Sequence, residues 1–269
     1  PPALAQQRAV TQWHAHAQTL VAAFTGRGNA AQAYTMALIQ VAVYDATVAV
    51  RGVEPKNKQR DKPFIADIAA PIGADLNAAI ATAAFRVGYE RVNSNQAARS
   101  TYLNAYQAFL AEIPDGQAKT DGIVVGEATA QAVLAARSKD NFYNTASYTN
   151  PAAEPGVWQS VTTATLYATA GANDYAMAFT MPLTAASPDA RRIKPAVRLS
   201  SGKYRRDFEE TKIHGALTST TRTPAMTNVV QFWTESGFTL WSRNVRDIVT
   251  ARGLDEFNAA RALAAFSVA

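Results

Sequence analysis

One segment of the chain combines hydroxyl and basic side chains in a way that could hold an anion. Residues 218–224 read Thr-Ser-Thr-Thr-Arg-Thr-Pro, and Thr223 before Pro224 is typical of a helix start. Free backbone N–H groups at a helix start attract negative charge. We therefore predict that Lys212, Arg222 and Thr223 lie near a bound anion. The simpler alternative is that the hydroxyls only cap the helix and that the two cations pair with nearby carboxylates.

The helix that starts at Pro224 should run to about Glu235 and would carry Phe232 and Trp233. These two aromatic side chains are the candidates for the wall of an anion pocket. This assignment is a hypothesis that follows from the helix start.

The rest of the sequence offers no catalytic constellation. His14 and His16 are two residues apart on a predicted helix and therefore point away from each other, and Glu210 with His214 is more typical of a surface pair than of a metal site. The sequence contains no HExxH motif, no phosphate-binding P-loop, no dinucleotide-binding glycine pattern and no nucleophile elbow. We predict neither a catalytic nor a metal-binding residue in this chain.

Composition excludes several functional classes. The 269 residues are 48% hydrophobic, enough for a sizeable core, and carry a formal net charge of +5. Basic residues concentrate at 191–206 without the interleaved aromatics of nucleic-acid-binding modules, so we expect no nucleic-acid partner. Residues 34–50 are apolar but interrupted by Gln40 and Asp45, which favours a core helix over a membrane span. The absence of cysteine excludes disulfides and thiolate chemistry.

A compartment hint comes from Ala3-Leu4-Ala5, which resembles the small-residue end of a secretory signal. We therefore expect a periplasmic or secreted protein.

Hydrophobic spacing predicts an all-α protein, a bundle of about nine helices. Apolar residues recur with helical periodicity in segments separated by Gly, Pro and Asp, and Asn93 or Ser94 is expected to cap the fourth segment. Gly122 and Gly126, four residues apart, would let another helix approach closely. The predicted helices span residues 10–24, 34–51, 76–87, 94–109, 117–137, 203–217, 224–235 and 255–269.

The helical pattern disappears between residues 138 and 202. This stretch is too long for an ordinary loop and too rich in aromatic residues for free disorder, so we predict an ordered, non-helical excursion that lies across the helices or across the missing half. The chain thus divides into amino-terminal helices (1–137), the excursion (138–202) and a second helical part (203–269). The aromatic residues of the excursion are Phe142, Tyr143, Tyr148, Trp158, Tyr167, Tyr175 and Phe179.

The predicted helix at 255–269 is apolar on nearly every face. Such a helix has to be buried, and we expect its partner to lie in further residues beyond Ala269 or in another chain. The sequence is therefore interpreted as an incomplete fold that needs a carboxy-terminal helical half.

Five segments of the chain, in their order, resemble the amino-terminal helical half of bacterial vanadium-dependent haloperoxidases, relatives of the type 2 phosphatidic acid phosphatases. Each segment alone is short, but their combination extends over almost the whole chain. They are MALIQVAVYDA (36–46), IPDGQAKTDGIVVGEATAQAVLAAR (113–137), PGVWQ (155–159), FEETKIHGALTSTTRT (208–223) and QFW (231–233).

The resemblance implies an all-helical enzyme in which a carboxy-terminal half, or a second chain, completes a pocket for vanadate or phosphate. The lysine, arginine, Pro-Ser-Gly-His and final histidine motifs that form this pocket in the family do not occur here, so no catalytic residue carries over. The implied activity of the whole protein is oxidation of a halide by peroxide at bound vanadate. Phosphoester hydrolysis in the same kind of pocket, acting on a small-molecule substrate, is the alternative within the superfamily.

A third hypothesis is a non-catalytic helical module that binds a partner through the excursion. Homodimer formation also stays open at this point.

Overall fold

The computed structural model describes residues 8–24, 28–52, 61–146, 151–157, 175–187, 189–190 and 195–269. In these ranges the protein has nine α-helices, one short 3₁₀ helix and no strand, which confirms the all-α prediction. The Ala3–Ala5 segment and the aromatic residues Tyr148, Trp158 and Tyr167 lie outside the described residues.

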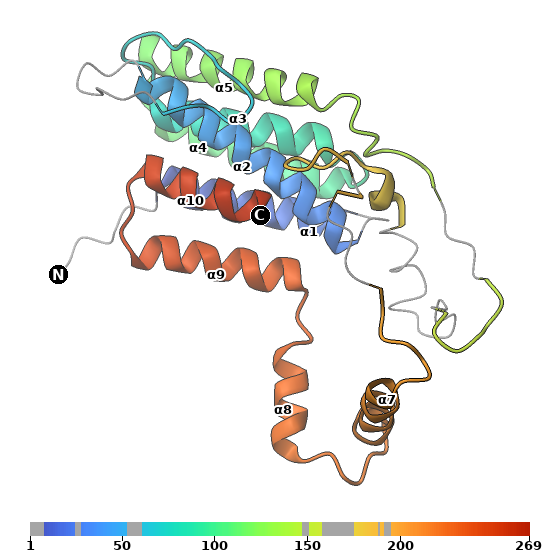
Figure 1. Ribbon diagram of the computed structural model, residues 1–269. Coiled ribbons are helices and arrows are strands. Elements are labelled where there is room, and N and C mark those ends of the chain that lie inside the picture. The colour runs from blue at the N-terminus through green and yellow to red at the C-terminus, as the bar shows by residue number, and fades with distance from the viewer. Residues whose placement is uncertain are drawn as a thin grey trace.

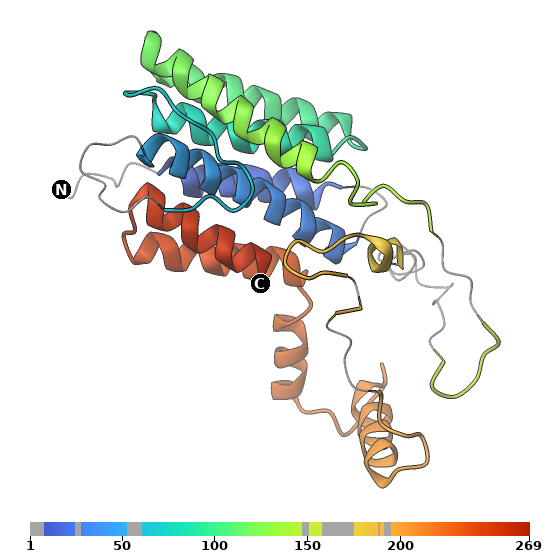
Figure 2. The same ribbon diagram turned by 45° about the horizontal axis from the view of Figure 1, so that its top comes forward.

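The helices form three layers and a projecting arm (Figures 1 and 2). Helices α3, α4 and α5 make one outer layer, α1 and α2 lie in the middle, and α9 and α10 cover the opposite side. The bounds are α1 Ala9–Ala22, α2 Asn29–Gly52, α3 Leu76–Arg91, α4 Gln96–Glu112, α5 Gln117–Ala136, η1 Ala176–Phe179, α7 Gly202–Gly215, α8 Pro224–Phe232, α9 Gly237–Ala251 and α10 Glu256–Val268.

Helix α2 is the centre of the core, because its sequence is apolar all round and such a helix must be buried on every side. It packs against α1, α3, α5, α9 and α10, and Leu38, Ile39 and Val41 are fully buried. By length and composition α2 could also cross a membrane, but 83% of its most apolar stretch is buried inside this fold. The predicted core helix is therefore found.

A buried carboxylate on α2 anchors the segment that leads to α3. Asp45 lies within the MALIQVAVYDA stretch and accepts hydrogen bonds from the backbone N–H groups of Phe64, Ile65 and Ala66 at 2.6, 2.9 and 2.7 Å. Burial raises the pKa of Asp45, and the three hydrogen bonds oppose that effect. The charge in the middle of an apolar helix thus has a structural role, since it orders an irregular segment against the core.

The glycine spacing on α5 does permit close helix approach, as predicted. A Cβ on Gly122 would lie 2.3 Å from the backbone oxygen of Asp75, and one on Gly126 would lie 2.5 Å from that of Ala79 and 2.7 Å from Cβ of Thr82. Because these contacts are with the α3 backbone and a β-branched side chain, they cannot be relieved by a rotamer change.

The expectation for the last helix was wrong in one respect. Helix α10 does need an apolar partner, but that partner is α2 of this same chain, with further contacts to α1 and α9. Phe257 and Leu263 are buried in this interface, whereas Phe266 keeps 41% of its surface exposed.

Several helix boundaries differ from prediction, and α9 is a helix that was not predicted from the sequence. Asn95, and not Asn93 or Ser94, caps α4, because its side chain accepts a hydrogen bond from the N–H of Ala98 at 3.0 Å. Helix α8 ends at Phe232, short of Glu235. Thr223 caps α8 with Pro224 in the first turn, as predicted.

Helices α7 and α8 form an arm, residues 202–233, that points away from the bundle (Figures 1 and 2). Neither helix buries a single residue. Phe208 on α7 is 50% exposed, and its ring stacks on Tyr204 of the same helix at 5.9 Å between ring centroids. The arm is therefore helical without an internal core of its own.

Replacing Gly126 with alanine should destabilise the protein. Alanine favours the helix intrinsically, but its methyl group would push α3 and α5 apart, so we expect a net loss of about 1–3 kcal/mol in the free energy of unfolding. Urea denaturation followed by circular dichroism measures it. The matched control is Gly202→Ala, where nothing lies within 4 Å of the added methyl group. Equal stability of the Gly126→Ala and Gly202→Ala variants would contradict the close α3–α5 packing.

Candidate functional site

The structure brings together two of the five predicted site residues. Arg222 and Thr223 lie side by side in the turn between α7 and α8, and Lys212 is exposed on the last turn of α7. Phe232 and Trp233 lie at the opposite end of α8. They form an edge-to-face pair at 5.1 Å between ring centroids and are 63% and 57% exposed, so they do not line a pocket with Arg222 among the described residues.

Arg222 closes the carboxyl end of α7. Its Nη1 donates hydrogen bonds to the backbone oxygens of His214 and Ala216 at 2.9 and 3.0 Å, where a positive charge also opposes the negative end of the helix dipole. Thr223 accepts a hydrogen bond from the N–H of Met226 at 3.2 Å. Both residues therefore have capping roles. The sequence left open that Arg222 pairs with a nearby carboxylate, but among the described residues its guanidinium bonds to backbone oxygens instead.

Hydroxyl groups complete this turn. Ser219 donates to the backbone oxygen of Ile213 at 2.7 Å and accepts from the N–H of Arg222 at 3.1 Å, while Thr221 Oγ1 lies 3.4 Å from Nδ1 of His214. The arrangement can order the turn and offer polar groups to a neighbouring molecule. The hydroxyl–histidine contact of this turn, Thr221 with His214, is exposed.

The sequence did not reveal an ion pair that is the most deeply buried of those in the described part of the chain. Arg91 at the end of α3 pairs with Asp140 at 2.9 Å, and both side chains are about 95% buried, with exposures of 5% and 4%. Asp140 also accepts hydrogen bonds from the hydroxyl of Tyr34 at 2.9 Å and from the N–H of Phe142 at 2.9 Å. Its carboxylate joins α2, α3 and the start of the excursion.

Arg137 extends this network to a later part of the excursion. Its guanidinium donates to the Tyr34 hydroxyl at 2.7 Å and to the backbone oxygens of Met181 and Pro182. Burial is the largest cause that raises the pKa of Tyr34 to about 12. Phe142 is buried and stacks on Tyr34 at 5.6 Å. The predicted excursion thus lies across the helices where it is described, and buried charge holds it there.

A buried histidine ties α9, the root of the arm, to α1. Nη1 of Arg246 donates hydrogen bonds to Nδ1 of His14 at 3.2 Å and to Oε1 of Gln18 at 2.6 Å. Burial, with the charge of Arg246 as a smaller cause, lowers the pKa of His14 to about 3. His14 is therefore neutral at neutral pH. His16 instead lies beside Trp13, at 5.4 Å, so the two histidines do diverge.

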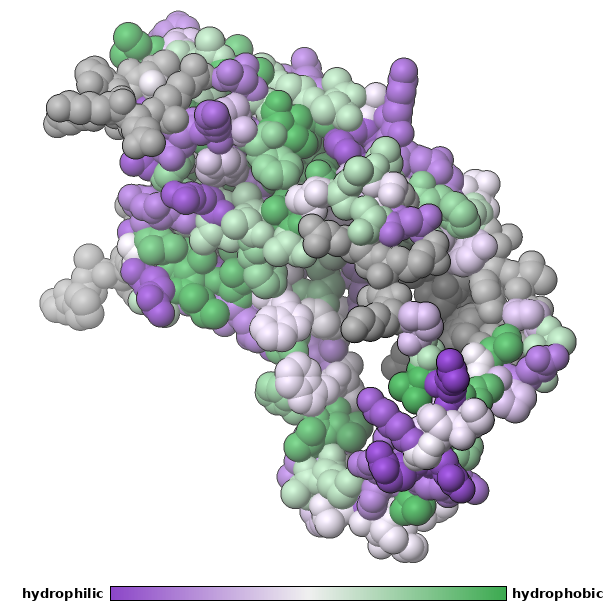
Figure 3. Space-filling view, viewed as in Figure 1, coloured by the Kyte–Doolittle hydropathy of each residue, from purple (hydrophilic) through white to green (hydrophobic). Residues whose placement is uncertain are grey.

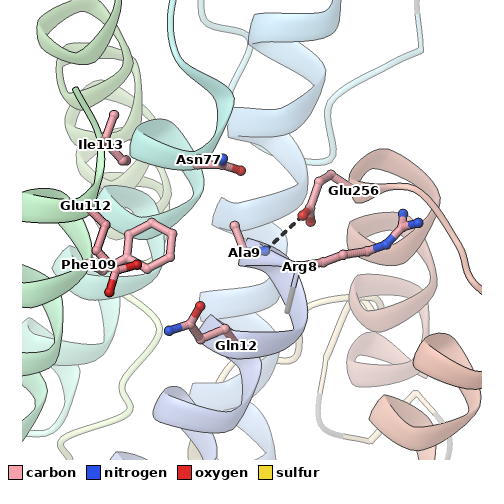
Figure 4. A pocket seen from close by; sticks show the side chains of 8 residues that line it. All are labelled: Arg8, Ala9, Gln12, Asn77, Phe109, Glu112, Ile113 and Glu256. Atoms are coloured by element: carbon pink, nitrogen blue, oxygen red, sulfur yellow. Dashed lines mark hydrogen bonds between the residues drawn. The ribbon is translucent and has the colours of Figure 1, made fainter. Parts of the chain in front are cut away.

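A cavity of about 600 Å³ opens at the end of the bundle where α1 and α10 begin (Figure 4). Glu256 faces it, and its carboxylate accepts from the N–H groups of Ala9 and Val10 at 2.8 and 3.0 Å. Burial raises the pKa of Glu256. This carboxylate caps α1 in place of a local side chain and is committed to that role. Glu112 lies across the cavity, near Gln12, in a setting that pairs no base with a nucleophile.

No group of three or more His, Asp or Glu side chains that could hold a metal ion occurs among the described residues. The polar clusters found there hold the fold together.

Comparison with known proteins gives no further lead, because no protein-family model, no curated protein and no solved structure matches this chain.

Neutralising the buried carboxylate should be costly. In Asp140→Asn the charge of Arg91 stays buried without its counter-ion, for which we expect a loss of about 3–5 kcal/mol in the free energy of unfolding. The control is Asp115→Asn, which removes the exposed partner of Lys119 and should barely change the urea midpoint. A similar, small effect of both changes would show that the Arg91–Asp140 pair does not hold the excursion.

His14 should make stability depend on pH. The pKa of His14 is lower in the folded protein than in the unfolded chain. His14 of the unfolded chain therefore binds a proton below about pH 6.5, whereas His14 of the folded protein binds one only at about pH 3. The contribution of His14 to the free energy of unfolding is therefore fully present above pH 6.5. It falls as the pH is lowered, by about 1.4 kcal/mol per pH unit at most. Between pH 6.5 and 5 the wild type should lose about 2 kcal/mol more than His14→Gln in urea titrations. Parallel curves for the two proteins would rule out a buried neutral histidine.

Proposed function

We propose that this chain is the amino-terminal scaffold of a vanadium-dependent haloperoxidase-like enzyme, and that a further helical unit supplies the oxyanion site. The proposal rests on the resemblance of the five segments quoted above and on one structural observation, the arm whose two helices bury nothing. An exposed helix of 9–14 residues is marginally stable in water. A partner that packs on it would explain why the sequence encodes it with caps at both helix starts.

The apolar residues of α7 indicate where this unit would pack. Phe208 and Ile213 on α7 are 50% and 48% exposed, and Leu217, two residues after the end of α7, is 94% exposed. The Arg222–Thr223 turn follows directly, and Lys212 lies on the same helix. In this proposal the further unit covers α7 and brings its own cationic side chains beside this turn, with Phe232 and Trp233 as the more distant wall.

The residues described here do not fit vanadate or phosphate by themselves. Arg222 is engaged with two α7 carbonyls, and the hydroxyls of Ser219 and Thr221 bond within the turn. They can support an anion pocket from one side only. The positive charge that holds the oxyanion, and every group that reacts, is therefore assigned to the further unit.

Activity and composition of the native material test this function together. The 269-residue chain alone should not oxidise bromide with hydrogen peroxide, whereas protein purified from its own cells, with any longer polypeptide or co-purifying chain that intact-mass analysis identifies, should do so only with orthovanadate. Hydrolysis of a phosphate ester without vanadate would identify a phosphatase instead. Native material with neither activity would leave the non-catalytic binding module as the function.

A variant pair sharpens the test. Phe208→Asp should abolish association with the further unit and the activity with it, while circular dichroism stays unchanged because Phe208 is not part of a core. The control is Ile72→Asp, which alters an 84% exposed residue far from the arm. Full activity of the Phe208→Asp protein would remove α7 from the proposed interface.

A further inference from the structure

The arm formed by α7 and α8 has little support from the bundle. Its two helices bury no residue, and neither packs extensively on a bundle helix. In the space-filling view the arm meets the bundle at a narrow neck with open space beside it (Figure 3). The direction in which the arm points therefore depends on its two ends, where residues 195–201 and residues 233–236 connect it to the rest of the chain.

The first half of the junction at 233–236 belongs to α8. The N–H of Trp233 donates to the backbone oxygens of Val229 and Val230 at 3.2 and 3.1 Å. The hydroxyl of Thr234 donates to the backbone oxygen of Gln231 at 2.6 Å. Residues up to Thr234 are therefore bonded to α8 and move with the arm.

The second half of the junction is bonded to the bundle. The carboxylate of Glu235 accepts hydrogen bonds from both terminal nitrogens of Arg243 on α9, at 2.6 and 2.8 Å. The hydroxyl of Ser236 donates to Oδ1 of Asn29, the first residue of α2, at 3.1 Å. The backbone oxygen of Ser236 accepts from the N–H of Leu240 in α9 at 2.9 Å. The hydrogen bonds thus change sides between Thr234 and Glu235.

We propose that Thr234 and Glu235 are a hinge of the arm, and that the Glu235–Arg243 ion pair is a latch that limits the directions in which the arm can point. Hinges are a few residues between elements whose backbone angles change while the elements stay intact. With the latch closed, only the backbone angles between Thr234 and Glu235 are not fixed by a neighbouring hydrogen bond. Opening the latch also frees the angles between Glu235 and Ser236, and it breaks no hydrogen bond within α8 or α9.

The surroundings of the latch allow it to open. The side chains of Arg243 and Glu235 are 44% and 33% exposed, so water and salt screen their attraction. The hydrogen bond with Glu235 is the largest cause that raises the pKa of Arg243, and the charge of Asp247, four residues along α9, is a smaller one. When Glu235 leaves, Asp247 stays near Arg243, and the arginine therefore keeps a carboxylate close by.

A latched hinge would let the arm adapt to whatever it binds. A molecule that contacts the arm can stabilise one of its directions over the others, and it shifts the population by the difference in its affinity for them. This inference goes beyond the proposed function, because it concerns a motion within this chain and does not depend on what covers α7. Its test uses the full chain alone, and its result is therefore independent of any enzyme activity.

Spin labels on introduced cysteines measure the direction of the arm, because the chain contains no other cysteine. Ala225→Cys lies far from the hinge on α8, about 14 Å from Thr234 at 1.5 Å per residue, and Ile248→Cys lies at a 60% exposed position of α9. With the latch intact, we expect double electron–electron resonance to give one narrow distance distribution. Glu235→Gln should broaden and shift this distribution. Sodium chloride at about 1 M, where the Debye length is about 3 Å, should act in the same direction.

Two controls separate a change at the latch from a change in the bundle. Asp115→Asn removes an exposed ion pair with Lys119, away from the hinge, and should leave the arm distance as it is. Labels at Val124→Cys on α5 and Ile248→Cys on α9 should give the same distance with Glu235 or Gln at position 235, which shows that the bundle is intact. A narrow, unshifted arm distance in the Glu235→Gln protein would overturn the proposal, and so would a broad one while Glu235 is present.

Discussion

Burial of α2 on every side is the constraint from which the rest of the bundle follows. A helix with apolar residues around its whole circumference cannot lie at a surface, so other helices must surround it, and five of this chain do so. The alanines and glycines of α2, α3 and α5 allow short distances between axes, which places backbone as well as side chains in contact. Gly122 and Gly126 show how strict this is, since a single methyl group would overlap the α3 backbone.

Inside this apolar frame four buried polar groups have specific partners, and each partnership fixes a segment that the helices alone would leave undetermined. Asp45 orders the segment before α3, and Asp140 ties the excursion to α2 and α3. His14 and Glu256 do the same for α9 and α10. An unpaired buried charge lowers the stability of the fold by several kcal/mol. The arrangement of the irregular segments that provides these partners is therefore more stable than arrangements that do not.

The arm differs from the bundle in energetic terms. Its helices rely on capping hydrogen bonds and on local stacking, with no buried apolar surface to add cooperativity. Elements of this kind open at low free energy. The contrast between a tightly packed bundle and an uncovered arm is why interaction with a further unit is central to the function we propose.

Local signals in the sequence determined the helical class, most helix starts and the close approach of another helix to α5. The cap at Thr223 and the glycine spacing on α5 act over three or four residues, so they can be read without knowing the fold. Only the tertiary structure determines which residues and helices far apart in the sequence contact each other. It showed that α10 packs on α2, that Arg91 meets Asp140 across 49 positions of sequence, and that Arg222 serves α7 as a cap. The reason is physical: a charge or an apolar face specifies that it needs a partner, but only chain folding determines which partner comes within reach.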